Sequence, residues 1–176
     1  MENRRNFIKK TSLLSLGMVS YGFNLPIIKT IGGVDISVIT YSFQAGTEDM
    51  ENIIQYCLDS NSDNIELMGN HVERSIGMPR SRKDSADWRA NVSMKEFKKV
   101  KKEFEQKGIN IFAYKPYCMS PRNKDEEIEY AMKATKALGA DYVTAELTDE
   151  SNTKRISYYA EKHDVKVGYH GHLQST

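Results

Sequence analysis

The strongest constraint on the fold is a repeated change between two hydrophobic periodicities, which begins near residue 34. Short runs rich in β-branched and aromatic residues alternate with segments whose apolar residues recur every three or four positions. The runs predicted as strands start near residues 36, 64, 109, 141 and 165. Because a helical segment follows each of the first four runs, the order predicts parallel βαβ units.

Four helices are expected between these strands. The first is indicated by apolar residues at helical spacing, which are Met50, Ile53, Ile54, Cys57 and Leu58. Ser93 is a suitable N-cap for the second, and Gly108 and Gly139 suit the ends of the second and third. The fourth is expected over residues 153–163. The polar segment 69–91 is interpreted as a connection of the length found in lids and binding loops.

Two architectures have this order of elements, an open doubly wound sheet and a closed (β/α)8 barrel. No Gly-x-Gly-x-x-Gly turn follows the first strand, which removes the main support for a dinucleotide-binding sheet. In strand 142–147, the polar residues Tyr142, Thr144 and Glu146 share one face, as expected for side chains near a barrel axis. A complete barrel needs about 250 residues. We therefore expect residues 34–176 to be the N-terminal part of a TIM barrel, with about five parallel strands and four helices.

The first residues are typical of an export signal. Arg4 and Arg5 precede Phe7-Ile8-Lys9, and a moderately apolar stretch then continues to about Phe23. This pattern resembles the twin-arginine signal, which the bacterial export machinery recognises. The stretch is too short and too rich in Ser and Gly to be a stable membrane span. We expect residues 1–30 to be signal and linker and the protein to be periplasmic; an amphipathic helix of a cytoplasmic protein is the alternative.

The charge distribution argues against nucleic acid as a partner. The first 30 residues hold five of the 25 basic and one of the 24 acidic residues, so residues 31–176 carry a net charge of −3 with His neutral. Proteins that bind the phosphate backbone usually carry the opposite sign. A nucleic-acid-binding function is therefore not expected.

The candidate functional residues gather at the carboxyl ends of the expected strands, where parallel α/β folds place their sites. They are Glu66, His71, Lys115, Tyr117, Glu146, His170 and His172. Carboxylates and imidazoles suit a divalent metal ion of the Mn, Mg or Zn type. They also suit proton transfer next to a carbonyl group. Glu146 and His170 are the predicted catalytic residues, and Glu146 is also the predicted metal ligand.

Four of these residues, Glu66, His71, Lys115 and His172, are predicted to bind substrate, and Trp88 is a fifth position with this role. Trp88 could stack on a sugar ring from the segment 69–91. Several alternatives remain open at this point. Glu66 could form a salt bridge with Lys115 across neighbouring strands, and His71 could be an exposed loop residue without a role.

Four segments together resemble the xylose isomerase-like TIM-barrel superfamily. They are residues 65–71, 113–117, 138–143 and 168–172. Within that superfamily, the resemblance is to exported proteins described as sugar phosphate isomerases/epimerases, and it covers residues 34–176. It implies a divalent metal held by carboxylates and a His at strand ends. It also implies isomerisation, epimerisation or dehydration of sugars and inositols through enediolate chemistry.

The resemblance also implies roles for individual residues. Glu146 matches a strand-end carboxylate that binds the metal, and His170 and His172 match a His-rich segment near the substrate. The remaining metal ligands would lie beyond residue 176. The expected function is a metal-dependent isomerase, epimerase or dehydratase acting on a sugar or keto-sugar. The alternatives are an endonuclease IV-like phosphodiesterase on the same fold, which the charge disfavours, and a non-catalytic periplasmic carbohydrate-binding protein.

Overall fold

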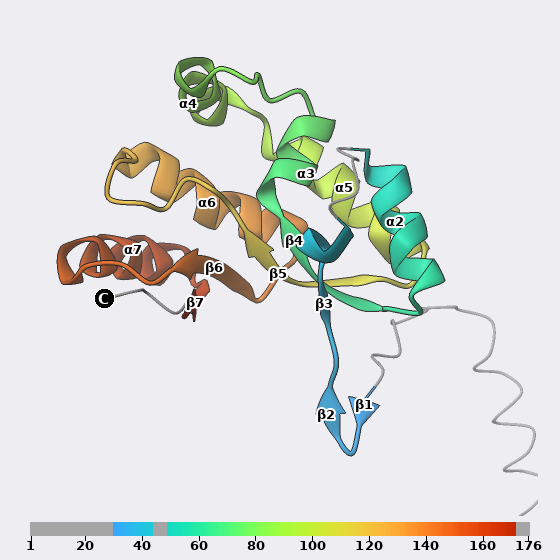
Figure 1. The fold of residues 1–176 in the computed structure, drawn as a ribbon. Coiled ribbons are helices and arrows are strands. Elements are labelled where there is room, and N and C mark those ends of the chain that lie inside the picture. Colours follow the sequence, from blue (N-terminus) through green and yellow to red (C-terminus); the bar gives the residue numbers. More distant parts are fainter. Residues whose placement is uncertain (1–29, 44–48, 172–176) are drawn as a thin grey trace, which may run out of the picture.

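The computed structural model describes residues 30–43 and 49–171, and a parallel five-stranded sheet forms their centre. The strands lie in chain order, as β3 (Val38–Ile39), β4 (Asn64–Met68), β5 (Asn110–Lys115), β6 (Tyr142–Glu146) and β7 (Lys166–His170). Neighbouring strands are parallel throughout, with the longer helices on one side of the sheet (Figure 1). The predicted α/β class with five parallel strands is confirmed.

Six α-helices accompany the sheet in the described part of the chain. They are α2 (Met50–Asp59), α3 (Gly69–Ser75), α4 (Arg82–Asn91), α5 (Met94–Gln106), α6 (Asp125–Leu138) and α7 (Glu150–His163). Four of them begin at a residue whose side chain accepts a hydrogen bond from a first-turn N–H group, namely Asp49, Ser81, Ser93 and Asp149. The predicted N-cap at Ser93 is confirmed, and Gly139 ends α6 with a positive φ of 75°.

The interpretation of residues 69–91 as one long loop is wrong, and with it the expected number of four helices. The segment folds into α3 and α4, joined by residues 76–81. Val72 and Glu73 of α3 are fully buried. The sequence of α4 is polar, so hydrophobic periodicity gives no helical signal there.

The first expected strand is much shorter than the predicted run of residues 36–43. Only Val38 and Ile39 pair with β4, and the chain then turns into the 3-10 helix η1 (Thr40–Phe43). The hydroxyl of buried Thr40 accepts a hydrogen bond from the backbone N–H of Met68, at 2.9 Å. The Thr40 side chain thus accepts the hydrogen bond that a backbone carbonyl of a longer β3 would have accepted.

Ahead of the sheet, β1 (Thr30–Ile31) and β2 (Val34–Asp35) form a short antiparallel hairpin. Gly32 and Gly33 make its turn, and both have positive φ, which glycine adopts without steric cost. In the described part of the chain, none of the helices has both the length and the apolar character that crossing a membrane requires. The predicted signal, apart from Thr30, lies outside the described residues.

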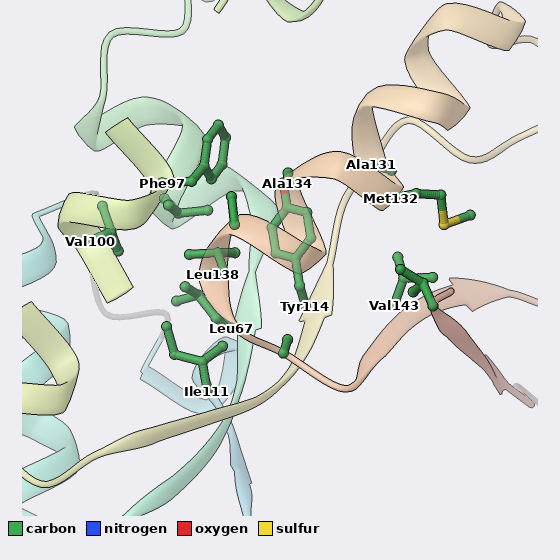
Figure 2. Packing of buried hydrophobic residues seen from close by; sticks show 14 of the residues in the cluster. Leu67, Phe97, Val100, Ile111, Tyr114, Ala131, Met132, Ala134, Leu138 and Val143 are labelled. Atoms are coloured by element: carbon green, nitrogen blue, oxygen red, sulfur yellow. The ribbon is translucent and has the colours of Figure 1, made fainter. Parts of the chain in front are cut away.

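The hydrophobic core lies between the sheet and its helices. Figure 2 shows Leu67, Ile111, Tyr114 and Val143 of three neighbouring strands beside residues of α5 and α6. Complete burial of one large apolar side chain contributes about 1.5–3 kcal/mol. Cys57 of α2 is fully buried, and burial raises the pKa of its thiol to about 12. This thiol therefore stays protonated at neutral pH.

A β-bulge in β5 decides which side chains reach the open face of the sheet. Ile65 pairs with Ile111, but the next residue, Glu66, pairs with Ala113, so β5 contains one extra residue. After the bulge, Lys115 pairs with Met68, and Met68 lies two positions after Glu66 in β4. Because side chains alternate along a strand, Glu66 and Lys115 point to the same face.

Candidate functional site

Four predicted site residues come together on the open face of the sheet. Glu66 lies on β4, and three others end their strands, namely Lys115 on β5, Glu146 on β6 and His170 on β7. Glu146 and His170 are register partners, so their side chains are neighbours on this face. The prediction that these residues share one end of the sheet is confirmed.

Glu66 contacts side chains on two strands that are not its neighbours in the sheet. Its Oε1 atom accepts a short hydrogen bond from Oγ1 of Thr144 and lies 2.9 Å from Nε2 of His170. Its carboxylate therefore reaches across β5 to side chains on β6 and β7. Ala113, the register partner of Glu66, carries only a methyl group, which leaves room for this crossing. The result is a carboxylate–imidazole pair that can hold one shared proton.

Lys115 pairs with the second carboxylate of the cluster. Its Nζ atom lies 2.5 Å from Oε1 of Glu146. The lysine side chain is 8% exposed, whereas the glutamate side chain is 56% exposed. The alternative in which Lys115 forms a salt bridge with Glu66 is therefore wrong. The buried lysine stem fixes a positive charge, and the exposed carboxylate can exchange that partner for a ligand without unfolding the strand.

Tyr117 follows Lys115 and borders the cluster. Partial burial, together with the neighbouring Tyr41 phenol and Glu146 carboxylate, raises the pKa of Tyr117 above its usual value. Its hydroxyl therefore remains a hydrogen-bond donor at neutral pH. A hollow of about 350 Å³ lies beside it, and Lys115 and Glu146 are among the residues that line this hollow. A small ligand could contact the lysine, the glutamate and the phenol together.

Two predicted substrate-binding residues do not join this cluster. His71 lies on α3 rather than in an exposed loop and is 4% exposed, with its Nδ1 atom 3.1 Å from Oγ1 of Thr40. Trp88 lies on α4, and its ring packs edge-on against Tyr130, with the centroids 6.3 Å apart. The indole thus contributes to packing between α4 and α6. His172 lies outside the described residues.

The structure gives the predicted metal site little support from the described residues. Nowhere in residues 30–43 and 49–171 do three or more His, Cys, Asp or Glu side chains gather as a metal ion would require. Glu66 and His170 supply two suitable groups, and Glu146 is paired with an ammonium group.

A buried network of charged side chains around Glu73 was not predicted from the sequence of residues 69–91. Glu73 is fully buried and forms an ion pair with Arg89 at 2.9 Å, and Arg89 also contacts Glu127 at 3.2 Å. The hydroxyls of Tyr114 and Tyr130 donate to Glu73 as well, at 3.3 and 2.9 Å. This network ties α3, α4 and α6 to the strand that carries Lys115.

One signal could have revealed Glu73. Gly69, Val72, Glu73 and Ile76 are spaced as the buried face of a short helix. A carboxylate on such a face requires a buried cation, and Arg89 is one of the basic residues of the same segment. The polar character of the segment concealed this pattern.

Comparisons with known proteins support the fold alone. No protein-family model matches the chain, and no curated protein matches it. Among solved structures, the chain is similar to an uncharacterised protein from Parabacteroides distasonis ATCC 8503, with 18% identity and a TM-score of 0.55. The match covers 77% of this chain and 52% of the other, so the chain spans about half the length of that structure.

Proposed function

We propose that this chain belongs to a metal-dependent sugar isomerase, epimerase or dehydratase that acts on a keto-sugar through enediolate chemistry. The observation that carries the proposal is the pairing of Glu66 with His170 beside the Lys115–Glu146 ion pair, at the carboxyl ends of parallel strands. The sheet would form part of a (β/α)8 barrel over residues 34–176, preceded by an export signal over residues 1–30. The strand order and the helices on one side of the sheet support the barrel.

The arrangement suits proton transfer between adjacent carbons. The Glu66–His170 pair can accept a proton from the carbon next to a carbonyl group and return it to the neighbouring carbon. Lys115 would stabilise the negative charge that develops on the substrate oxygen. The Tyr117 hydroxyl would donate a hydrogen bond to the same intermediate. In an isomerisation, a second proton must also pass from the neighbouring hydroxyl group to the former carbonyl oxygen, so two protons leave the substrate and two return to it, which balances the reaction.

A divalent metal, of the Mn, Mg or Zn type, remains part of the proposal, with Glu146 as one ligand and the other ligands beyond residue 176. A bound metal would polarise the carbonyl oxygen of the sugar. Glu146 would then leave Lys115 in order to coordinate the ion. Its 56% exposure makes such a change of partner feasible without loss of core packing.

The test compares Glu146→Ala with Glu150→Ala in the full-length protein. Glu150 is a matched control because its exposed carboxylate on α7 pairs only with Lys154 of the same helix among the described residues. The proposal expects Glu146→Ala to abolish metal-dependent turnover of a keto-sugar, and Glu150→Ala to leave it unchanged. Equal turnover in the two variants contradicts the assignment.

A further inference from the structure

A basic groove of about 850 Å³ lies between α3, α4 and the segment that leads into α6. Six cationic residues line it besides Arg89, namely Arg74, Arg80, Arg82, Lys83, Arg122 and Lys124. Two of its three acidic residues, Glu73 and Glu127, already pair with Arg89. Since residues 31–176 carry a net charge of −3, this groove concentrates positive charge on an otherwise acidic body.

Several of these cations are available to a ligand. Arg82, Lys83, Arg122 and Lys124 are exposed, and within residues 30–43 and 49–171 none of the four forms an ion pair. Arg82 begins α4, whereas Arg122 lies between β5 and α6. Two guanidinium groups therefore approach the groove from separate elements. Such planar groups match the two oxygens of a carboxylate.

A second observation at the same groove indicates a ligand with hydroxyl groups. Asn70 lines the groove, and its Oδ1 atom is buried without a hydrogen-bond partner among the described residues. An unsatisfied buried polar atom costs about 1–3 kcal/mol. Rotation of the Asn70 side chain toward the groove would let a hydroxyl group of a bound sugar donate to this oxygen and remove that cost.

The helix ends near the groove already use one backbone N–H group each. A phosphate is commonly bound by free N–H groups at a helix N-terminus. Here the Ser81 side chain accepts from the N–H of Asp84 in α4, and the Glu127 side chain accepts from the N–H of Lys124 at the start of α6. The side chains of the arginines and lysines are therefore the main anion-binding groups left in the groove.

Tyr117 connects the groove with the candidate site. It lines the groove, and it also lines the hollow beside Lys115 and Glu146. A ligand whose acidic group lies in the groove can thus extend past Tyr117 to Lys115 and Glu146.

We propose that the substrate is a sugar acid, whose carboxylate is bound by Arg82 and Arg122 and one of whose hydroxyls donates to Asn70. The claim that this sugar acid is converted by the protein rests on the proposed function. The anion-binding part stands on the groove alone, so that the two can be tested separately.

The test measures binding of D-glucuronate, D-galacturonate, D-glucose and D-glucose 6-phosphate to the full-length protein by calorimetry. A uronate should bind at least about tenfold more tightly than glucose. Arg82→Gln combined with Arg122→Gln should weaken uronate binding at least about tenfold, since each charged hydrogen bond is worth a factor of this size or more. The matched control, Lys98→Gln with Lys102→Gln, removes two exposed cations from α5 and should leave binding unchanged.

Three results overturn the inference. They are no uronate binding to the unaltered protein, equal weakening by the two double variants, and tighter binding of the phosphate ester through the same arginines. Turnover separates this inference from the proposed function. If a uronate binds through the arginines and no sugar is turned over, the groove assignment stands and the reaction fails. If a neutral keto-sugar is turned over without preference for acids, the reaction stands and the groove assignment fails.

Discussion

Oε1 of Glu66 lies 2.9 Å from Nε2 of His170, although the two residues are 104 positions apart in the chain. The contact spans from β4 to β7 and passes over β5 and β6. Thr144 donates to the same carboxylate oxygen and fixes its position. One hydrogen-bonded group thus joins three strands of the sheet at the end where Lys115 and Glu146 also lie.

Substitution of either member of this pair should remove the proposed proton transfer. Glu66→Gln and His170→Asn should each lower kcat at least about 100-fold, because general acid–base catalysis typically contributes about 10²–10⁴. The free energy of unfolding should change by about 1 kcal/mol or less, since His170 lies at the end of an edge strand of the described sheet. Turnover assays and urea denaturation measure the two quantities.

The matched control for this pair is His163→Asn on α7, which makes the same change outside the open face of the sheet. It should leave kcat unaltered. Because Glu66 and His170 would act as one unit, the double variant should be little slower than either single variant. A double variant whose loss equals the product of the single losses would show that the residues act independently.

Gly69 tests whether close packing positions Lys115. A Cβ atom at Gly69 would lie 2.9 Å from the carbonyl oxygen of Lys115 and 2.9 Å from Cα of Pro116, both of them backbone atoms. Gly69→Ala should therefore displace the end of β5 and reduce the free energy of unfolding by about 1–3 kcal/mol. Gly171→Ala is the matched control, because a Cβ atom there meets no described residue within 4 Å.

Urea denaturation of the two alanine variants gives the comparison. Equal stability would mean that β5 and α3 can separate at no cost. Crowding at Gly69 would then not explain how the strand end is held.

The sequence predicted most of the sheet and its longer helices because their hydrophobic periodicity is regular. Strands β4 to β7 and helices α2, α5, α6 and α7 all overlap the expected regions. The failures have local physical causes. The first strand is short because the Thr40 hydroxyl takes over a hydrogen bond to β4. Helix α4 was missed because its contribution to the fold is an ion pair and one aromatic contact, not an apolar stripe.

Four of the predicted site residues lie together in the structure, but how they pair was not predicted. Glu66, Lys115, Glu146 and His170 were identified because polar residues stood at the ends of apolar strands. Their partners depend on the bulge near Ala113, which determines the face of the sheet to which Lys115 points and its position along the neighbouring strand. No pattern in the sequence marks that bulge. The choice between two carboxylates for one lysine therefore required the structure.

The Glu73–Arg89 pair should be essential for stability. Breaking a buried ion pair by removing one partner costs about 3–5 kcal/mol, since the remaining charge is left without compensation. Glu73→Gln should therefore lower the free energy of unfolding by several kcal/mol, whereas Glu103→Gln, an exposed carboxylate on α5, should change it little. The double variant Glu73→Leu with Arg89→Met should recover much of the loss, because both charges are then absent.

Chemical denaturation of the three variants measures these changes. A small effect of Glu73→Gln would indicate that Glu127 alone compensates Arg89, to which it lies 3.2 Å away. The buried network would then be redundant, and α4 would be held by the contact between Trp88 and Tyr130.

Glu129 on α6 should make the protein sensitive to acid. Hydrogen bonds from Lys162 and then from His163, both on α7, lower the pKa of this carboxyl group from 4.5 to about 2. A carboxyl group with a lowered pKa in the folded state stabilises that state above its unfolded pKa. This stabilisation is complete above pH 4.5, and it is lost as the pH falls from 4.5 toward 2. Glu129→Gln should lower the neutral-pH stability by about 1 kcal/mol, because these ion pairs are open to solvent screening.

The pH dependence distinguishes this ion-pair effect from a packing effect. In the unaltered protein, the free energy of unfolding should decrease between pH 4.5 and pH 2, partly through Glu129. In Glu129→Gln, the curve should start lower by about 1 kcal/mol at pH 7 and decrease less steeply, so that the two curves converge near pH 2. Curves that remain parallel down to pH 2 would mean that the substitution acts through packing. The contact between α6 and α7 would then depend on shape, and the charges of Lys162 and His163 would contribute little to it.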